Sequence, residues 1–420
     1  MRNRLIIIGN GFDLECGLKS CFESFFTGRF SEGSANRPDP GEMNLWDYIF
    51  QFMKEVKSDI SYDWKDVEAA IKDWIRVIFD ASDDVSSKDD SSFASAQWVI
   101  GRMLAGKTST LYFIEAVLRS EEFLISDNVE DKLFSSRYSK PEYLSDGVIV
   151  SRAFKEYEST LGSILKQIRR YINSLKDIGT IDNFLFNELH KFENSFVNYI
   201  NNELSQTYYK NAVKLYEIIS DFDIRLALIG GENNDYVLSF NYTRPNTADS
   251  GMHSCCWRNV HGNLKDRNII FGFDIEDLPY EQRKDPRLLR FTKTYRVFQL
   301  QKSQEGQHPG LLDPVARGEA FDAIVVYGHS LGRADYSYFK AIFDCVDLYS
   351  SNVTLEFLYP SDYPQAGSRL YKAVSDLLVD YGDEMPDKAR GRNLMHKLLL
   401  ENRLSVAEID TSSLAKDKEE

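Results

Sequence analysis

The chain has 420 residues and carries 50 basic against 65 acidic side chains, a formal net charge of −15. With 43% hydrophobic and 13% aromatic residues, its composition is that of a globular protein rather than a disordered chain. The acidic excess argues against general affinity for a nucleic-acid backbone. No apolar run approaches the roughly 20 residues that a membrane-spanning helix needs, so no membrane association is expected.

The cysteines and the amino-terminal segment indicate a cytoplasmic protein. The five cysteines form no Cys-x-x-Cys pair, which is typical of reduced thiols and argues against a structural zinc site. The histidines lack the His-x-x-x-His spacing of a helical metal site, so no metal is expected. The first apolar run has four residues, too few for a signal peptide.

The first predicted element is a buried strand at residues 5–8, which leads into a glycine turn. Gly9, Asn10 and Gly11 allow the chain to turn tightly into a helix, whose positive end and backbone N–H groups suit a phosphate. Asp13 follows at a position where it could meet a ribose hydroxyl or cap the helix. The strand, turn and helix together predict a nucleotide-binding segment.

Helical spacing dominates residues 31–224, and strand-forming runs return after them. We therefore expect one α/β domain made of residues 1–30 and 225–370, interrupted by a helical insertion at 31–224. Residues 371–420 are expected to form amphipathic helices and a charged tail.

Four later runs have strand character, at residues 236–240, 268–273, 323–327 and 353–358. Three of them lead into glycine, asparagine or proline turns, as buried strands do when their carboxyl ends form a ligand crevice. With the strand at 5–8, they predict an α/β fold with a Rossmann-like parallel sheet.

Polar residues gather at the ends of the predicted strands, in turns far apart along the chain. They are Asn241, His261, Gly328, His329, Ser330 and Asp335. Because the carboxyl ends of parallel strands lie along one edge of a sheet, we expect these residues to converge with the first glycine turn.

Each of these residues also has a purely structural interpretation. Asn241 could form an Asx turn, His261 could be a hydrogen-bonded core histidine, and Asp335 could cap a helix. We favour Asn241 and His261 as catalytic residues. Gly328, His329, Ser330 and Asp335 are then ligand-binding residues, together with the first glycine turn and Asp13.

A serine hydrolase is a further alternative. Residues 328–332 match the Gly-x-Ser-x-Gly spacing of a nucleophile elbow, with Ser330 just after a predicted strand. That mechanism requires an acid and then a histidine downstream, and only His396 follows, far along the chain.

These motifs resemble the AbiH family of bacteriophage abortive-infection proteins. The resemblance is carried, in order, by residues 7–14, Trp64–Glu68, Ser239–Thr243, Val260–Gly262, Tyr327–Leu331 and Asp335. It implies a role in antiphage abortive infection, with a phage-encoded trigger as a partner.

A more distant resemblance is to sirtuin-like NAD-consuming domains of antiphage systems. It is carried by Gly9–Gly11, Asn241–Tyr242, His261–Gly262, and Gly328–Leu331 with Asp335. It implies NAD or another nucleotide as substrate or ligand, Asn241 orienting a water or ribose hydroxyl, and His261 as general base. The zinc module and glycine motif of deacetylases are missing, so deacetylation is not implied.

Two molecular functions remain open at this point. The protein either cleaves a nucleotide in the manner of an NAD glycohydrolase, or it senses a nucleotide or binds a phage protein without catalysis. A homo-oligomer is compatible with either.

Glu68 lies in the predicted insertion, one helical turn after Trp64. It is either a solvated surface acid or a catalytic carboxylate that the insertion lowers towards Asn241 and His261. In the second case it would bind a ribose hydroxyl or stabilise an oxocarbenium ion.

Overall fold

The computed structural model describes residues 2–30, 42–56, 64–83, 167–168, 170–175, 178–222, 233–245, 254–302, 320–361 and 363–415. The chain divides into two compact units. The first, here called the sheet unit, comprises Met1–Phe25, Phe196–Leu278 and Lys293–Glu420. The second, the helical unit, comprises Phe26–Ser195 and Pro279–Thr292. The predicted domain boundaries at residues 30, 224 and 370 stay predictions.

The sheet unit is built on six parallel strands in the order β3-β2-β1-β4-β5-β6. They are β1 (Arg2–Ile8), β2 (Asn233–Ser239), β3 (Ser254–Asn259), β4 (Ala323–Tyr327), β5 (Thr354–Pro360) and β6 (Leu404–Ile409). This is the strand order of doubly wound nucleotide-binding sheets, in which ligands bind beside the carboxyl ends of the strands. The prediction of an α/β fold with a parallel sheet is confirmed.

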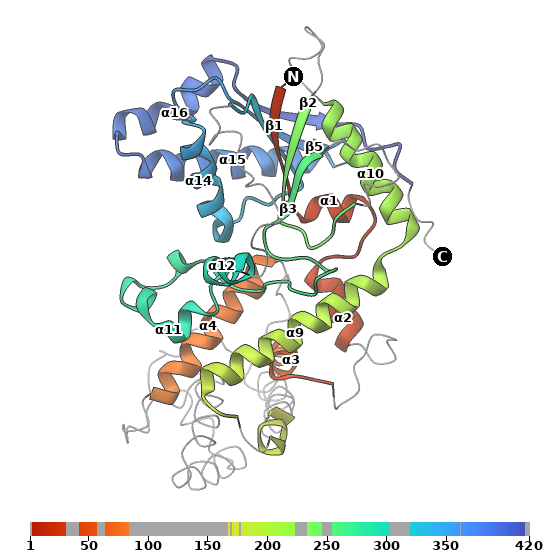
Figure 1. Ribbon diagram of the computed structural model, residues 1–420, viewed down its shortest axis with the longest axis vertical. Coiled ribbons are helices and arrows are strands. Elements are labelled where there is room, and N and C mark those ends of the chain that lie inside the picture. The colour runs from red at the N-terminus through yellow and green to blue at the C-terminus, as the bar shows by residue number, and fades with distance from the viewer. Residues whose placement is uncertain are drawn as a thin grey trace, which may run out of the picture. The chain divides into compact units, whose positions relative to one another are not determined.

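Helices cover both faces of this sheet (Figure 1). Leu5 and Ile7 of β1 belong to a core that also includes Phe339, Leu377 and Leu394. Those three residues lie on α14 (Tyr336–Cys345), α15 (Pro364–Glu384) and α16 (Lys388–Leu400). The other face carries α1 (Asn10–Glu15) and α10 (Gln206–Asp221). β1 is buried on both faces, because its four apolar residues alternate between the two layers.

Several local predictions differ from the structure. The helix expected after the first glycine turn is short: α1 ends at Glu15, and Gly17 adopts a φ of +89° before α2 (Phe22–Phe30) begins. The strand expected at 268–273 is wrong: this apolar segment is a buried loop with a single bridge residue. β3 and β6 were not predicted as strands.

The helical unit contains α3 (Leu45–Val56), α4 (Trp64–Asp83), α11 (Pro286–Leu289) and parts of α2 and α9 (Ile181–Glu203). Its core is aromatic, with the rings of Phe26, Phe50 and Phe192 in mutual contact. Much of the region 31–224, for which helical spacing predicts helices, lies outside the described residues.

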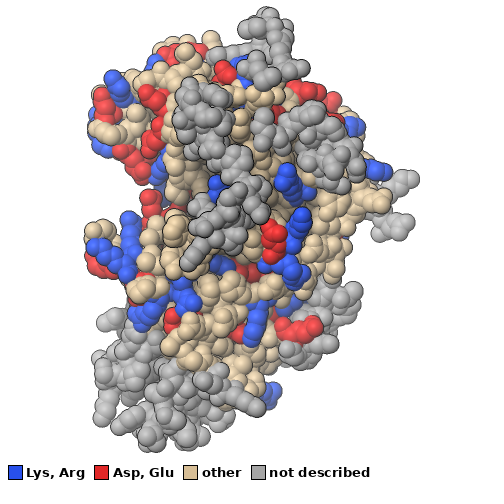
Figure 2. Space-filling view, in the orientation of Figure 1, with Lys and Arg blue, Asp and Glu red and all other residues tan. Residues whose placement is uncertain are grey.

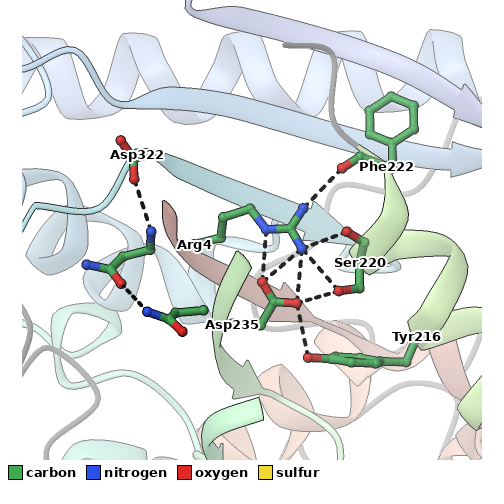
Figure 3. Close-up of polar contacts among 8 residues, drawn as sticks. Arg4, Tyr216, Ser220, Phe222, Asp235 and Asp322 are labelled. Carbon is green, nitrogen blue, oxygen red and sulfur yellow. Dashed lines mark hydrogen bonds and ion pairs between the residues drawn. The ribbon is translucent and has the colours of Figure 1, made fainter. Parts of the chain in front are cut away.

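A buried ion pair closes the amino end of the sheet (Figure 3). Arg4 on β1 donates to both carboxylate oxygens of Asp235 on β2, at 2.9 and 3.0 Å. The same guanidinium donates to the carbonyls of Phe222 and Ser220, and the carboxylate also accepts from the hydroxyls of Ser220 and Tyr216. This network joins two strands to the end of α10.

Acidic and basic side chains both occur across the face drawn in Figure 2, although the net charge of the sequence is −15. Within the described ranges, no helix combines the length and apolar character needed to cross a membrane.

Candidate functional site

The turns after β1 and β4 pack directly against each other through glycines. The N–H of Gly9 donates to the carbonyl of Tyr327 at 3.0 Å, and that of Gly11 to Gly328 at 2.7 Å. Gly328 has a φ of +67°, and a Cβ on it would lie 2.4 Å from the backbone nitrogen of Phe12. The glycines therefore allow close backbone approach, and these two N–H groups are used within the protein rather than offered to a phosphate.

Asp13 is buried and bonded within the sheet unit. Its carboxylate accepts from the hydroxyls of Thr243 and Tyr208, each at 2.8 Å, and from the side chain of Asn241. Burial raises the pKa of Asp13 to about 6, although these hydrogen bonds lower it. The residue thus joins α1 to the turn after β2 and to α10, whereas its predicted ribose contact stays a prediction.

The turn after β2 is held from the neighbouring strand. Asn259, the last residue of β3, donates its side-chain amide to the carbonyls of Asn241 and Thr243 at 2.7 and 2.8 Å. Asn10 likewise has a partner within the protein, since its side-chain oxygen accepts from Ser20 at 2.5 Å. The side chain of Asn241 contacts Asp13, as described above. The predicted catalytic role of Asn241 is untested.

His261 lies in the turn after β3, and 5% of its surface is exposed. Its carbonyl accepts from the N–H of Ile270 at 2.9 Å. Gly262 follows with a φ of +83°, and a Cβ there would overlap the carbonyl of Asn268 at 2.1 Å. The backbone on both sides of His261 is thus fixed. Its Nε2 atom is buried and has no hydrogen-bond partner among the described residues, and buried polar atoms are normally paired.

Asp335 faces His261 from η6 (Arg333–Asp335), the turn that begins α14. Its Oδ1 lies 3.9 Å from His261 Nε2 and 3.0 Å from the Nζ atom of Lys293. Its Oδ2 lies 3.6 Å from His329 Nε2. Three groups able to carry positive charge therefore surround one carboxylate at the carboxyl ends of β3 and β4.

His329 has a defined tautomer. Its Nδ1 accepts the backbone N–H of Leu331 at 2.9 Å, so in the neutral ring the proton is on Nε2 and points towards Asp335. The ring of Phe240, just after β2, contacts both imidazoles, with centroids 4.4 Å from His329 and 5.5 Å from His261.

The pKa values of His261 and Asp335 are both shifted far from their usual ranges. Burial and, to a smaller extent, the charge of Lys293 lower the pKa of His261 to about 3, although Asp335 acts in the opposite direction. Burial alone would raise the pKa of Asp335, but the ammonium of Lys293, together with His329 and His261, outweighs burial and holds that pKa well below its usual range. At neutral pH the cluster holds a neutral His261, an ionised Asp335 and the ammonium of Lys293.

The structure brings together His261, His329 and Asp335 of the predicted site, with Gly9, Gly11 and Gly328 packed alongside. Ser330 is exposed, and His396 is exposed on α16; the serine-hydrolase alternative is untested. Glu68 lies on α4 of the helical unit and is buried, so the interpretation of it as a solvated acid is wrong. Its catalytic role stays a prediction.

Lys293 and Tyr338 are site residues that the sequence analysis missed. Lys293 is the first residue of α12 (Lys293–Lys302), only 3% exposed, and nothing in the local sequence distinguishes it from a surface lysine. Tyr338 lies 5.8 Å from the His261 ring. It comes three residues after Asp335, so helical spacing could have indicated it.

The cluster is not arranged as a metal centre. Two histidines and one aspartate are a common metal-ligand set, but here the carboxylate of Asp335 forms an ion pair with the ammonium of Lys293. Across the ranges that the structure describes, no group of three His, Cys, Asp or Glu side chains is placed to hold a metal ion.

Comparison with known proteins connects this site to a family. The family model described as "Bacteriophage abortive infection AbiH" matches residues 5–359, which include β2, β3, β4 and most of β1 and β5 but not β6. No curated protein and no solved structure gives a significant match. Since the matched segment covers most of the chain and contains the whole His261 cluster, the protein belongs to the AbiH family of bacteriophage abortive-infection proteins.

Proposed function

We propose that this AbiH protein acts in antiphage abortive infection by binding a nucleotide such as NAD beside the His261 cluster. The observation that carries the proposal is the buried Nε2 of His261, which has no partner among the described residues. It lies where doubly wound sheets bind their ligands. A ribose hydroxyl would supply the missing hydrogen bond.

Catalysis is the second part of the proposal. In hydrolysis of the nicotinamide–ribose bond, water adds at the ribose carbon, nicotinamide leaves with the bonding electrons, and a base takes a proton from the water. His261 is the candidate base, and the ionised Asp335 would stabilise positive charge on the ribose. A pKa of about 3 makes the unliganded His261 a weak base, so binding without turnover is the competing outcome.

Purified protein mixed with NAD, ATP or ADP-ribose tests both parts. Calorimetry measures binding, and chromatography follows nicotinamide and other products. We expect His261→Gln to weaken nucleotide binding at least about tenfold, which is 1.4 kcal/mol. His396→Gln, at the exposed histidine of α16, is the matched control and should bind like the wild type.

The proposal fails if none of the three nucleotides binds, or if His261→Gln binds as tightly as the wild type. Expression of both variants in a phage-sensitive host then relates the site to defence. Loss of protection with His261→Gln alone is the expected result. A phage-encoded trigger and a homo-oligomer remain predictions that this experiment does not address.

A further inference from the structure

Lys293 and His261 compete for the same carboxylate oxygen. The ammonium lies 3.0 Å from Asp335 Oδ1, a hydrogen-bonding distance, whereas His261 Nε2 lies 3.9 Å from that atom, too far for a hydrogen bond. In this arrangement the ammonium holds the carboxylate, and the imidazole nitrogen is without a partner among the described residues.

We propose that Lys293 is a positioning residue that keeps Asp335 from pairing with His261 until an anionic group of the ligand binds the ammonium. The proposal rests on the nucleotide-binding function above, because a nucleotide brings phosphates to the site. Once a phosphate binds Lys293, Asp335 Oδ1 is free to accept a hydrogen bond from His261. The paired histidine is then a stronger base.

Burial makes this competition strong. Lys293 is 3% exposed and His261 5%, and the Asp335 side chain is 16% exposed. Charges in such surroundings interact more strongly than in water, so the binding of one anion changes the charge balance of the whole cluster.

The other titratable or charged groups around His261 do not replace Asp335. His329 faces Asp335 Oδ2, and its Nδ1 is engaged by Leu331. Tyr338 contacts the His261 ring, and the charges of Asp274 and Arg258 act on Tyr338. Asp274 itself accepts from the hydroxyl of Ser337 at 2.8 Å. Asp335 is therefore the carboxylate available to His261.

This arrangement selects a ligand class. A nucleotide with phosphates, such as ADP-ribose or NAD, can bind the ammonium and release Asp335. A nucleoside without phosphate, such as nicotinamide riboside, can meet His261 but leaves the ion pair between Lys293 and Asp335 intact. The site then distinguishes phosphorylated ligands from nucleosides, because only a phosphorylated ligand allows His261 to pair with Asp335.

Histidine titration by NMR, with ring-labelled histidine in the full chain, tests the proposal without a ligand. The signal of His261 is assigned by its loss in His261→Gln. Wild-type His261 should not titrate between about pH 5 and 8. In Lys293→Met its pKa should rise by about 1–3 units, because Asp335 becomes its partner. Lys293→Arg should restore the wild-type behaviour.

The double variant Lys293→Met with Asp335→Asn is the matched control, since it removes both charges and should show a smaller rise than Lys293→Met alone. An unchanged His261 in a folded Lys293→Met protein overturns the proposal. A rise in this unliganded experiment, with no nucleotide bound by the wild type, instead contradicts the proposed function and leaves the restraint by Lys293 standing.

A second experiment uses only wild-type protein, so it does not depend on any variant folding. ADP-ribose should raise the pKa of His261, and nicotinamide riboside should leave it unchanged. An equal rise with both ligands, or a rise with neither when both are bound, would show that the phosphate does not act through Lys293.

Discussion

Each end of the parallel sheet holds a buried polar cluster, and the two clusters differ in how completely their groups are paired. At the amino end, Arg4 and Asp235 bond to each other and to α10 through several hydrogen bonds (Figure 3). At the carboxyl end, the Nε2 of His261 is buried with no hydrogen-bond partner among the described residues. Paired buried groups stabilise a fold, whereas an unpaired one costs free energy that a ligand can recover. We therefore interpret the Arg4–Asp235 network as part of the scaffold and the His261 cluster as the candidate site.

The largest effect should come from breaking the amino-end network. Arg4→Met leaves the carboxylate of Asp235 buried without its cation, and we expect a loss of about 3–5 kcal/mol in the free energy of unfolding. Denaturant unfolding measures it. The double variant Arg4→Met with Asp235→Leu should lose much less, because no unpaired charge remains. A loss below about 1 kcal/mol in Arg4→Met would remove the contrast between the two ends.

Asp13, near the carboxyl ends of the strands, tests whether a buried group with hydrogen-bond partners can still lower the stability of the fold when it ionises. Its folded pKa of about 6 lies above the unfolded value of 3.8. Its contribution to stability is therefore complete below about pH 4 and is lost as the pH rises through 6. The loss is at most about 3 kcal/mol.

Thermal unfolding of the wild type and Asp13→Asn between pH 4 and 7 isolates this contribution. The difference between the two proteins should change across that interval, because the variant has no carboxyl group at this position. A constant difference would mean that Asp13 titrates near its usual value.

Gly328 tests the backbone packing beneath the site. Gly328→Ala places a Cβ at a φ of +67° and 2.4 Å from Phe12, so we expect a loss of more than about 2 kcal/mol. Gly332→Ala is the control, because its Cβ would meet only the Ser330 hydroxyl, at 3.6 Å. Denaturant unfolding that gives similar values for the two variants would contradict the close approach of the two turns.

The smallest stability effect is expected at the centre of the site. His261→Gln removes an imidazole whose Nε2 has no described partner to lose, so unfolding at pH 7 should change by less than about 1 kcal/mol. Nucleotide binding should fall in the same variant. If His261→Gln is destabilised as strongly as Arg4→Met, His261 belongs to the scaffold and the contrast between the two ends disappears.

The sequence predicted much of the sheet but not all of its strands. Residues 5–8 and 323–327 are short, apolar and bounded by glycine turns, and both are strands. Residues 268–273 have a similar composition but form a loop, because composition shows that a segment is buried and not whether a neighbouring strand is there to pair with it. β6 was missed because it is a half-buried edge strand among helical patterns.

The candidate site was predicted only in part for a related reason. His261, His329 and Asp335 each lie beside a turn signal, so their residue types and positions indicated them. Lys293 carries no such signal, since a lysine opening a helix is ordinarily a surface residue. Its role follows from where α12 begins, 42 residues before Asp335 in the chain and 3.0 Å from it in space.

The sequence by itself determined the parallel α/β class, the glycine turns and the histidines beside them, because strand composition and turn chemistry are local properties. Only the tertiary structure decided which of these residues meet. It placed Asn241 with Asp13, and it placed Asp335 between Lys293 and His261. The physical reason is that hydrogen bonds and charges act over a few ångströms in space, and separations along the chain do not specify those distances.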